Sequence, residues 1–219
     1  MKLSISFAAA VLFSRPLFVL GSALNLTHSD EERIRRSTNA NDAASLVPLS
    51  PVGPIAALQF NGDTRIYYQD SVLGGVMSLA VTNPFTTGHF LALQQIVPAN
   101  EIAFGSPIAL VNLPGTSSSD PFPEIHIFFV SPANILSSYI WRDSLGRFIG
   151  GSSCTECITT SGFVVQPNTK VLYALALGSG SSLVLRVGFV SAGAPSTISE
   201  AVSVGGQGSG QWVLSSLQN

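Results

Sequence analysis

Short apolar runs, rich in valine, isoleucine, leucine and aromatic residues, alternate with clusters of glycine, proline, serine and asparagine after residue 54. The runs show almost no helical periodicity, so they predict β-strands separated by turns. The first group of runs occupies residues 54–58, 65–69, 76–81 and 85–88. Four short runs joined by turns predict one four-stranded antiparallel sheet.

Two further groups of runs follow the same plan. The second occupies residues 107–111, 126–130, 135–140 and 148–151, and the third occupies 171–175, 186–190, 198–202 and Trp212. The groups recur at intervals of about 50 to 60 residues, close to the period of propeller blades. One such sheet cannot bury both of its faces alone, so the sheets must stack. We predict an all-β fold of β-propeller-like repeats, about three four-stranded antiparallel blades, with a β-sandwich as the alternative.

The first 51 residues have a different character. Residues 1–23 combine a basic start, apolar runs and small residues at the end, which predicts a secretory signal peptide and therefore an extracellular protein. Residues 24–51 are polar and charged, so we expect a linker or propeptide, in which Arg35-Arg36 is either a processing site or a solvated pair. The predicted folded domain is residues 52–219. No apolar run approaches the roughly 20 residues of a membrane-spanning helix, so we expect no membrane insertion.

Charged residues are sparse after Ser37, where five basic residues stand against nine acidic ones. The basic residues form no cluster that could follow a phosphate backbone, which argues against nucleic-acid binding. The same scarcity argues against electrostatic attachment to anionic lipids.

The only two cysteines, Cys154 and Cys157, have the Cys-x-x-Cys spacing. This spacing occurs in redox sites, in zinc sites and in local disulfides. The chain has no second pair, and an exported protein folds in an oxidising compartment. We therefore predict a structural disulfide, and we expect neither a metal nor a cofactor.

Aligning the three groups reveals candidate binding positions. The second runs align Arg65, His126 and Arg186; the third runs align Ser78, Ser137 and Glu200; the closing aromatic residues are Phe85, Phe148 and Trp212. An arginine donates several hydrogen bonds, a carboxylate accepts them from hydroxyls, and an aromatic face packs against the C–H side of a sugar ring. Only the third group offers all three types. They indicate either a sugar site or a cross-strand ion pair beside a core tryptophan.

Several motifs resemble those of the fungal fucose-specific lectin family. Residues 65–70 (Arg-Ile-Tyr-Tyr-Gln-Asp) resemble its Ile-Arg-Val-Tyr-Tyr-Gln strand, and residues 198–200 (Ile-Ser-Glu) resemble its Ile-x-Glu strand. Residues 105–109 (Gly-Ser-Pro-Ile-Ala) resemble the start of its next blade. The segments that begin at Phe85 and Phe148 resemble its Trp-containing closing segment, with phenylalanine in place of tryptophan. The similarity covers residues 52 to 215.

The resemblance implies a six-bladed propeller that binds L-fucose between adjacent blades, without catalysis and without a metal. It implies that Arg65 and Arg186 are sugar-contacting arginines, Glu200 the partner carboxylate and Trp212 the stacking residue. The first two groups depart from the family at His126, Ser78, Ser137, Phe85 and Phe148. A complete set of binding residues is therefore expected only in the third group.

Three groups are half of six blades. The resemblance therefore implies a homodimer that completes the propeller, a truncated sequence, or an open half-ring. Of these we predict the homodimer.

Other functions fit the sequence less well. A glycoside hydrolase needs paired carboxylates, and Glu200 has no carboxylate at an equivalent recurring position. No Gly-x-Ser-x-Gly elbow accompanies His89 or His126. We predict a secreted lectin that binds fucosylated glycans and is not an enzyme. The alternative is a degenerate propeller that acts as a secreted interaction protein without binding sugar.

Overall fold

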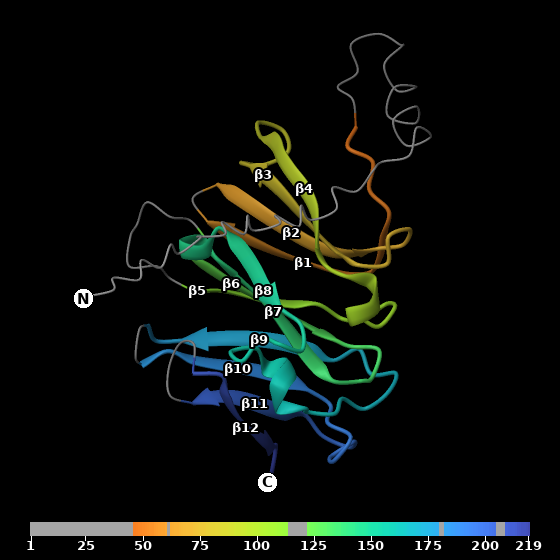
Figure 1. Ribbon diagram of the computed structural model, residues 1–219, viewed down its shortest axis with the longest axis vertical. Coiled ribbons are helices and arrows are strands. Elements are labelled where there is room, and N and C mark those ends of the chain that lie inside the picture. The colour runs from red at the N-terminus through yellow and green to blue at the C-terminus, as the bar shows by residue number, and fades with distance from the viewer. Residues whose placement is uncertain (1–45, 61, 114–121, 180–181, 205–208) are drawn as a thin grey trace, which may run out of the picture. The chain divides into compact units, whose positions relative to one another are not determined.

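The computed structural model describes residues 46–60, 62–113, 122–179, 182–204 and 209–219 (Figure 1). The predicted signal peptide and most of the predicted linker lie outside the described residues. Residues Leu49–Asn219 form one unit. Within the described ranges, no helix is long and apolar enough to cross a membrane.

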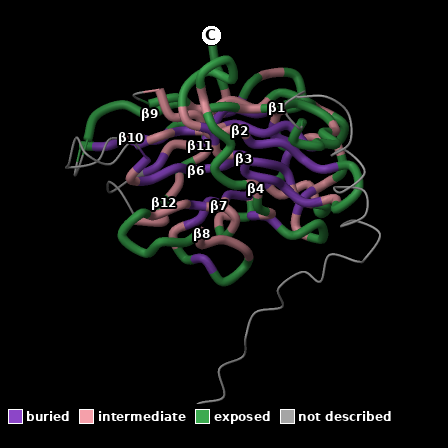
Figure 2. The backbone as a smooth tube through the Cα atoms, turned by 90° about the horizontal axis from the view of Figure 1, so that it is seen from above, coloured by how far each residue is buried: buried purple, intermediate pink, exposed green. Residues whose placement is uncertain are grey.

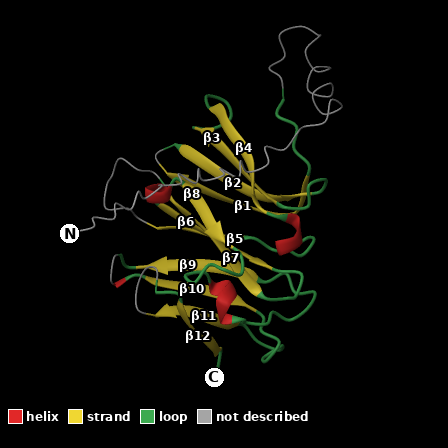
Figure 3. Cartoon of the chain, viewed as in Figure 1, coloured by secondary structure: helices red, strands yellow, loops and turns green. Residues whose placement is uncertain are grey.

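Each of the three groups of runs forms one four-stranded antiparallel sheet, as predicted. The first sheet contains β1 (Pro51–Phe60), β2 (Asp63–Asp70), β3 (Val76–Thr82) and β4 (His89–Val97). The second contains β5 (Ala109–Leu113), β6 (Glu124–Val130), β7 (Leu136–Arg142) and β8 (Arg147–Gly150). The third contains β9 (Leu172–Leu177), β10 (Val184–Phe189), β11 (Ser199–Val204) and β12 (Gln211–Ser216). The short 3-10 helices η2 (Ala99–Glu101), η3 (Asp143–Leu145) and η4 (Ile158–Ser161) lie in connections between strands (Figure 3).

The fourth strand of the first sheet was predicted too early in the chain. Residues 85–88 form the turn before β4, and Phe85 is 73% exposed there. Asn83 takes a left-handed conformation with φ of 58° at the start of this turn. A Cβ atom on Gly88 would lie only 1.8 Å from the Thr82 carbonyl oxygen, so the turn closes tightly against the end of β3.

The middle sheet is covered on both faces. Ile127 and Phe129 of β6 belong to the apolar core between the first and second sheets, whereas Phe128 and Val130 belong to the core between the second and third. Successive strand residues point to opposite faces, so every residue of β6 is buried. Figure 2 shows the same concentration of buried backbone along the strands. Two cores between three sheets exclude the two-layer β-sandwich.

The first strands of neighbouring sheets lie next to each other. β1 contacts β5, and β5 contacts β9, so the sheets follow one another in chain order as stacked blades do (Figure 1). The outer sheets expose apolar residues, among them Phe90 (49%), Leu175 (48%) and Val213 (52%).

A disulfide joins Cys154 and Cys157 in the segment between β8 and η4. Both residues are buried and pack against Ile140 and Ile149 of the second sheet. The bond thus holds the connection to the third sheet against the sheet that precedes it.

Candidate functional site

The strand register shows which positions of the three sheets are equivalent. Arg65, His126 and Arg186 are each the third residue of the second strand of their sheet, in agreement with the sequence alignment. Arg65 faces the cleft between the first and second sheets, and His126 faces the cleft between the second and third. Arg186 lies on the corresponding face of the third sheet, where no further sheet of the described chain follows.

The alignment of the third strands needs a correction. Glu200 lies opposite the fifth residue of β10, and Ser78 lies opposite the fifth residue of β2. The residue opposite the fifth position of β6 is Ser138, and not Ser137. The alignment of Ser137 with Glu200 was therefore wrong by one residue, and a shift of one residue in a strand moves a side chain to the other face.

The aromatic alignment needs a similar correction in the first sheet. Trp212 pairs with Ser203, three residues after Glu200, and Phe148 pairs with Trp141, which follows Ser138 by three residues in the second sheet. In the first sheet this place is occupied by Phe90, and not by Phe85. Phe90 is half-exposed on the outer face of the sheet.

Trp212 does not lie beside Arg186 and Glu200. Its ring packs against the core between the second and third sheets, 6.2 Å edge-on from Phe128. Arg186 and Glu200 lie on the opposite, outer face of the third sheet, because strand residues alternate between faces. The expectation that these three residues form one complete site in the third sheet was therefore wrong.

Arg186 and Glu200 form an ion pair, and Tyr173 donates a hydrogen bond to its carboxylate. Arg186 Nε donates to Glu200 Oε2 at 3.0 Å, and the Tyr173 hydroxyl donates to Glu200 Oε1 at 2.7 Å. A Cβ atom on Gly188 would come within 2.0 Å of the Tyr173 ring, so only glycine lets this ring cross the strand. The hydrogen bond from Tyr173 and those from Arg186 lower the pKa of Glu200. The carboxylate is held as an anion on an open face.

A cavity of about 310 Å³ lies between the first and second sheets. This volume falls at the lower end of the usual range for small-molecule pockets. The first sheet contributes Arg65, Tyr67, Ser78, Ala80, Ala92 and Gln94, and the second sheet with its connections contributes Phe122, Ile125, Trp141, Asp143 and Phe148. Polar groups come mainly from one wall and aromatic rings from the other.

Each wall of this cavity is held in place by local contacts. The Arg65 guanidinium lies 4.7 Å from the centre of the Phe122 ring, a cation–π contact. Trp141 Nε1 donates to the Phe122 carbonyl at 3.1 Å, and the Trp141 and Phe148 ring centres are 5.2 Å apart. Burial raises the pKa of Tyr67 to about 12, so its hydroxyl stays protonated. The cavity therefore offers hydrogen-bonding groups opposite a fixed aromatic surface.

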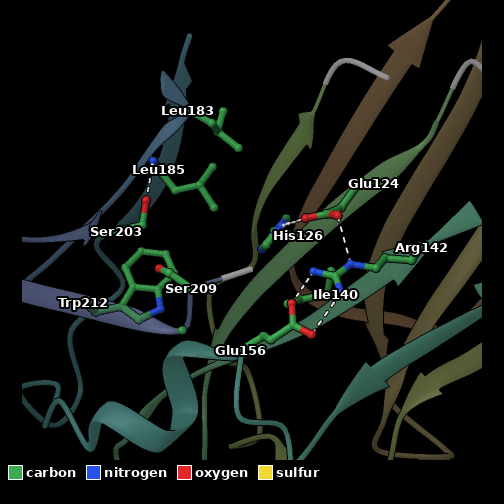
Figure 4. A pocket seen from close by; sticks show the side chains of 11 residues that line it. Glu124, His126, Ile140, Arg142, Glu156, Leu183, Leu185, Ser203, Ser209 and Trp212 are labelled. Carbon is green, nitrogen blue, oxygen red and sulfur yellow. Dashed lines mark hydrogen bonds and ion pairs between the residues drawn. The ribbon is translucent and has the colours of Figure 1, made fainter. Parts of the chain in front are cut away.

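The equivalent space between the second and third sheets has a volume of only about 10 Å³ (Figure 4). A chain of hydrogen-bonded polar side chains occupies it. His126 Nε2 lies 2.6 Å from Glu124 Oε1, Arg142 Nε donates to Glu124 Oε2 at 3.0 Å, and Arg142 Nη1 donates to Glu156 Oε1 at 3.0 Å. The Glu156 hydrogen bond is the main reason why the pKa of Arg142 is raised. There is room for about one water molecule and none for a sugar.

Two charged residues that line the clefts, Asp143 and Arg142, were missed in the sequence analysis. Asp143 lines the same cavity as Arg65 but belongs to the connection after β7, so the alignment of repeats did not reveal it. Arg142 lies directly opposite Glu124 across β6 and β7. Glu124 begins β6 and Arg142 ends β7, and opposite charges at paired positions of neighbouring strands indicate an ion pair once the strand register is known.

Several solved lectin structures have a similar fold. A lectin of Aleuria aurantia in complex with Fucα1-6GlcNAc has a TM-score of 0.56 and 23% sequence identity, over 78% of this chain and 50% of its own. AofleA from Arthrobotrys oligospora has a TM-score of 0.51 and 15% identity, over 80% of this chain and 46% of its own. The SapL1 lectin in complex with alpha methyl fucoside has a TM-score of 0.51 and 18% identity, over 81% of this chain and 52% of its own.

The chain spans about half the length of these lectins. No protein-family model matches it, and neither does any curated protein. The likeness establishes the fold, which is that of part of a propeller lectin. The resemblance inferred from residues 52 to 215 is confirmed at this level.

Proposed function

We propose that the chain is a lectin that binds L-fucose-containing glycans, without catalysis, in the cleft between the first and second sheets. The observation that carries the proposal is the cavity of about 310 Å³, in which Arg65 and Ser78 face the aromatic pair Trp141 and Phe148. A guanidinium donates to sugar hydroxyls, and an aromatic surface covers the apolar side of the ring. We further propose that the protein acts outside the cell, which detection of the protein without residues 1–23 in the culture medium would test.

Asp143 supplies what Ser78 lacks in this cleft. In the third sheet the residue in the register position of Ser78 is Glu200, a carboxylate. Asp143 brings a carboxylate to the same cavity from the following sheet. A sugar bound between Arg65 and Asp143 would have a donor on one side and an acceptor on the other.

Retention on fucose-agarose tests the proposal. The wild-type protein should be retained and then released by free L-fucose, and Arg65→Ala should weaken retention because it removes the guanidinium donors from the cleft between the first and second sheets. The double variant Arg186→Ala, Glu200→Ala should still be retained. No retention of the folded wild-type protein would refute fucose binding. Loss of retention only in the double variant would place the site on the outer face of the third sheet.

That outer face is the second place where a sugar site is proposed. A second copy of the chain could pack its first sheet there, so that Phe90 would face Arg186 and Glu200 as Phe148 faces Arg65. Phe90 is 49% exposed and occupies the same register position as Phe148, which supports this arrangement. The homodimer predicts a molecular mass twice that of the chain in light scattering, and a monodisperse monomer would rule it out.

The alternative function is that of a secreted interaction protein without sugar binding. The second cleft favours it, because charged side chains already fill the space that a sugar would occupy. The retention experiment separates the two functions.

A further inference from the structure

A larger cavity, of about 520 Å³, lies near the start of β7. Ser137 and Tyr139 of β7 line it, on the strand face that also carries Trp141, so this cavity and the proposed fucose cleft adjoin the same strand. The remaining walls come from η2, the turn 131–133, Gly151 with Ser152, and η4. None of the residues proposed for fucose binding lines it.

A carboxylate is fixed at one wall of this cavity. The Tyr139 hydroxyl donates to Glu101 Oε2 at 3.0 Å. A Cβ atom on Gly150 would lie 2.3 Å from the Tyr139 ring, so the glycine lets the ring lie flat across β8 and reach Glu101. Burial and the neighbouring Glu101 raise the pKa of Tyr139, which keeps its hydroxyl protonated as a donor.

The same tyrosine–glutamate unit occurs in the third sheet, but there a cation completes it. Tyr173 donates to Glu200, and Arg186 makes hydrogen bonds of 2.7 to 3.0 Å to the same carboxylate. Among the residues that the structure describes, no arginine or lysine lines the cavity at Glu101, and no ion pair reaches that carboxylate. Glu101 is thus held by a tyrosine and open to a cation from outside.

Hydroxyl and amide groups surround the carboxylate. Ser131, Ser137, Ser152 and Thr159 line the cavity, and so does Asn100. Ser137 is only 4% exposed, and its hydroxyl donates to the Ile135 carbonyl at 3.1 Å, which leaves its oxygen as an acceptor toward the cavity. Such groups match the hydroxyls of a small polyol.

We propose that this cavity binds a protonated primary amine carried on a hydroxylated ring, that is, an amino sugar. The ammonium group would pair with Glu101, and the ring hydroxyls would bind the serine, threonine and asparagine groups around it. A charge-assisted hydrogen bond is about twice as strong as a neutral one, so the charge of the ligand should decide binding. The site is separate from the proposed fucose cleft and does not depend on it.

Titration of the full chain with three probes tests the inference. D-Glucosamine should bind saturably and shift the backbone amide signals of η2 and β7 in NMR spectra. N-Acetylglucosamine keeps the hydroxyls without the charge, and cyclohexylamine keeps the charge without the hydroxyls. Each should bind at least about ten-fold more weakly than glucosamine. Equal binding of either probe, or no saturation by glucosamine, would overturn the assignment.

Variants assign the binding to this cavity. Glu101→Gln keeps the shape of the side chain and should weaken glucosamine binding at least about ten-fold, while retention on fucose-agarose stays unchanged. Tyr139→Phe should weaken it by a smaller factor, because the carboxylate loses its anchor. Asp63→Asn removes a carboxylate elsewhere in the first sheet and should have no effect. Unchanged glucosamine binding in a folded Glu101→Gln protein would refute the site.

Discussion

The cleft between the first and second sheets has a volume of about 310 Å³, whereas the cleft between the second and third has about 10 Å³. Both are bounded by equivalent strands, and both receive an aromatic residue from the same register position, Phe148 in one and Trp212 in the other. They differ at the arginine position, where Arg65 is replaced by His126. Histidine is shorter than arginine, and the ion pairs of Arg142 occupy the space beside it.

This difference teaches that the repeat fixes where a cleft forms but not whether it can hold a ligand. Arg65 makes one hydrogen bond to the backbone and a contact with an aromatic ring, so other guanidinium donors can serve a sugar. Arg142, in contrast, forms ion pairs with two carboxylates of the protein itself, those of Glu124 and Glu156. In the second cleft Arg142 and its two carboxylates satisfy one another, whereas the buried His126 Nδ1 has no hydrogen-bond partner among the described residues.

The largest expected effect comes from breaking the charged chain of the filled cleft. Arg142→Ala should lower the free energy of unfolding by about 3 kcal/mol, because it removes the guanidinium that pairs with the buried Glu124 carboxylate. The Glu124 side chain is only 6% exposed. Urea unfolding measures the change, with Arg147→Ala as a control that should stay within about 0.5 kcal/mol. A loss no greater than that of the control would show that the ion pairs do not hold this cleft together.

Replacing each of the two equivalent aromatic residues by alanine sharpens the comparison. Trp212→Ala should lower the free energy of unfolding by about 2 kcal/mol, since it leaves a hole beside Phe128, and it should leave fucoside binding unchanged. Phe148→Ala should weaken fucoside binding roughly ten-fold, because the sugar loses half of its aromatic surface. Calorimetric titration with methyl α-L-fucoside and thermal unfolding measure both. Weaker binding in the Trp212 variant alone would reverse the roles of the clefts.

The smallest effect concerns the ion pair on the outer face. The pKa of Glu200 is lowered in the folded protein, so its contribution to stability is present above the unfolded-state pKa of about 4.3. It should disappear as the pH falls through the lower folded-state value. Urea unfolding from about pH 6 to about pH 2 should show the difference between wild type and Glu200→Gln shrinking in acid. A difference that does not depend on pH would show that the carboxylate charge is not involved.

The three sheets could be predicted because turns and apolar runs repeat in the sequence. Phe85 was misplaced because the turn between β3 and β4 includes residues 85–88, which had been assigned to a strand. The register between these strands also shifts between Ala80 and Val81. Ser137 was misplaced because neighbouring serines at 137 and 138 look alike in the sequence. Only the pairing with β6 distinguishes them.

The candidate site was harder to predict than the strands. Arg186, Glu200 and Trp212 occur in one repeat, but strand alternation sends Trp212 to the opposite face. The open cleft instead combines Arg65 with residues of the following sheet, Trp141 and Asp143. The site depends on which sheets stack against each other, and the sequence of a single repeat does not contain this information.

One spectrum can report on both clefts, because the chain has only two tryptophans and each cleft contains one of them. The measurement is a ¹H–¹⁵N NMR titration with methyl α-L-fucoside that follows the two indole N–H signals, assigned with a Trp141→Phe variant. Sugar binding in the open cleft predicts that the Trp141 signal moves to saturation while the Trp212 signal stays in place. Movement of the Trp212 signal alone, or of neither, would contradict the account.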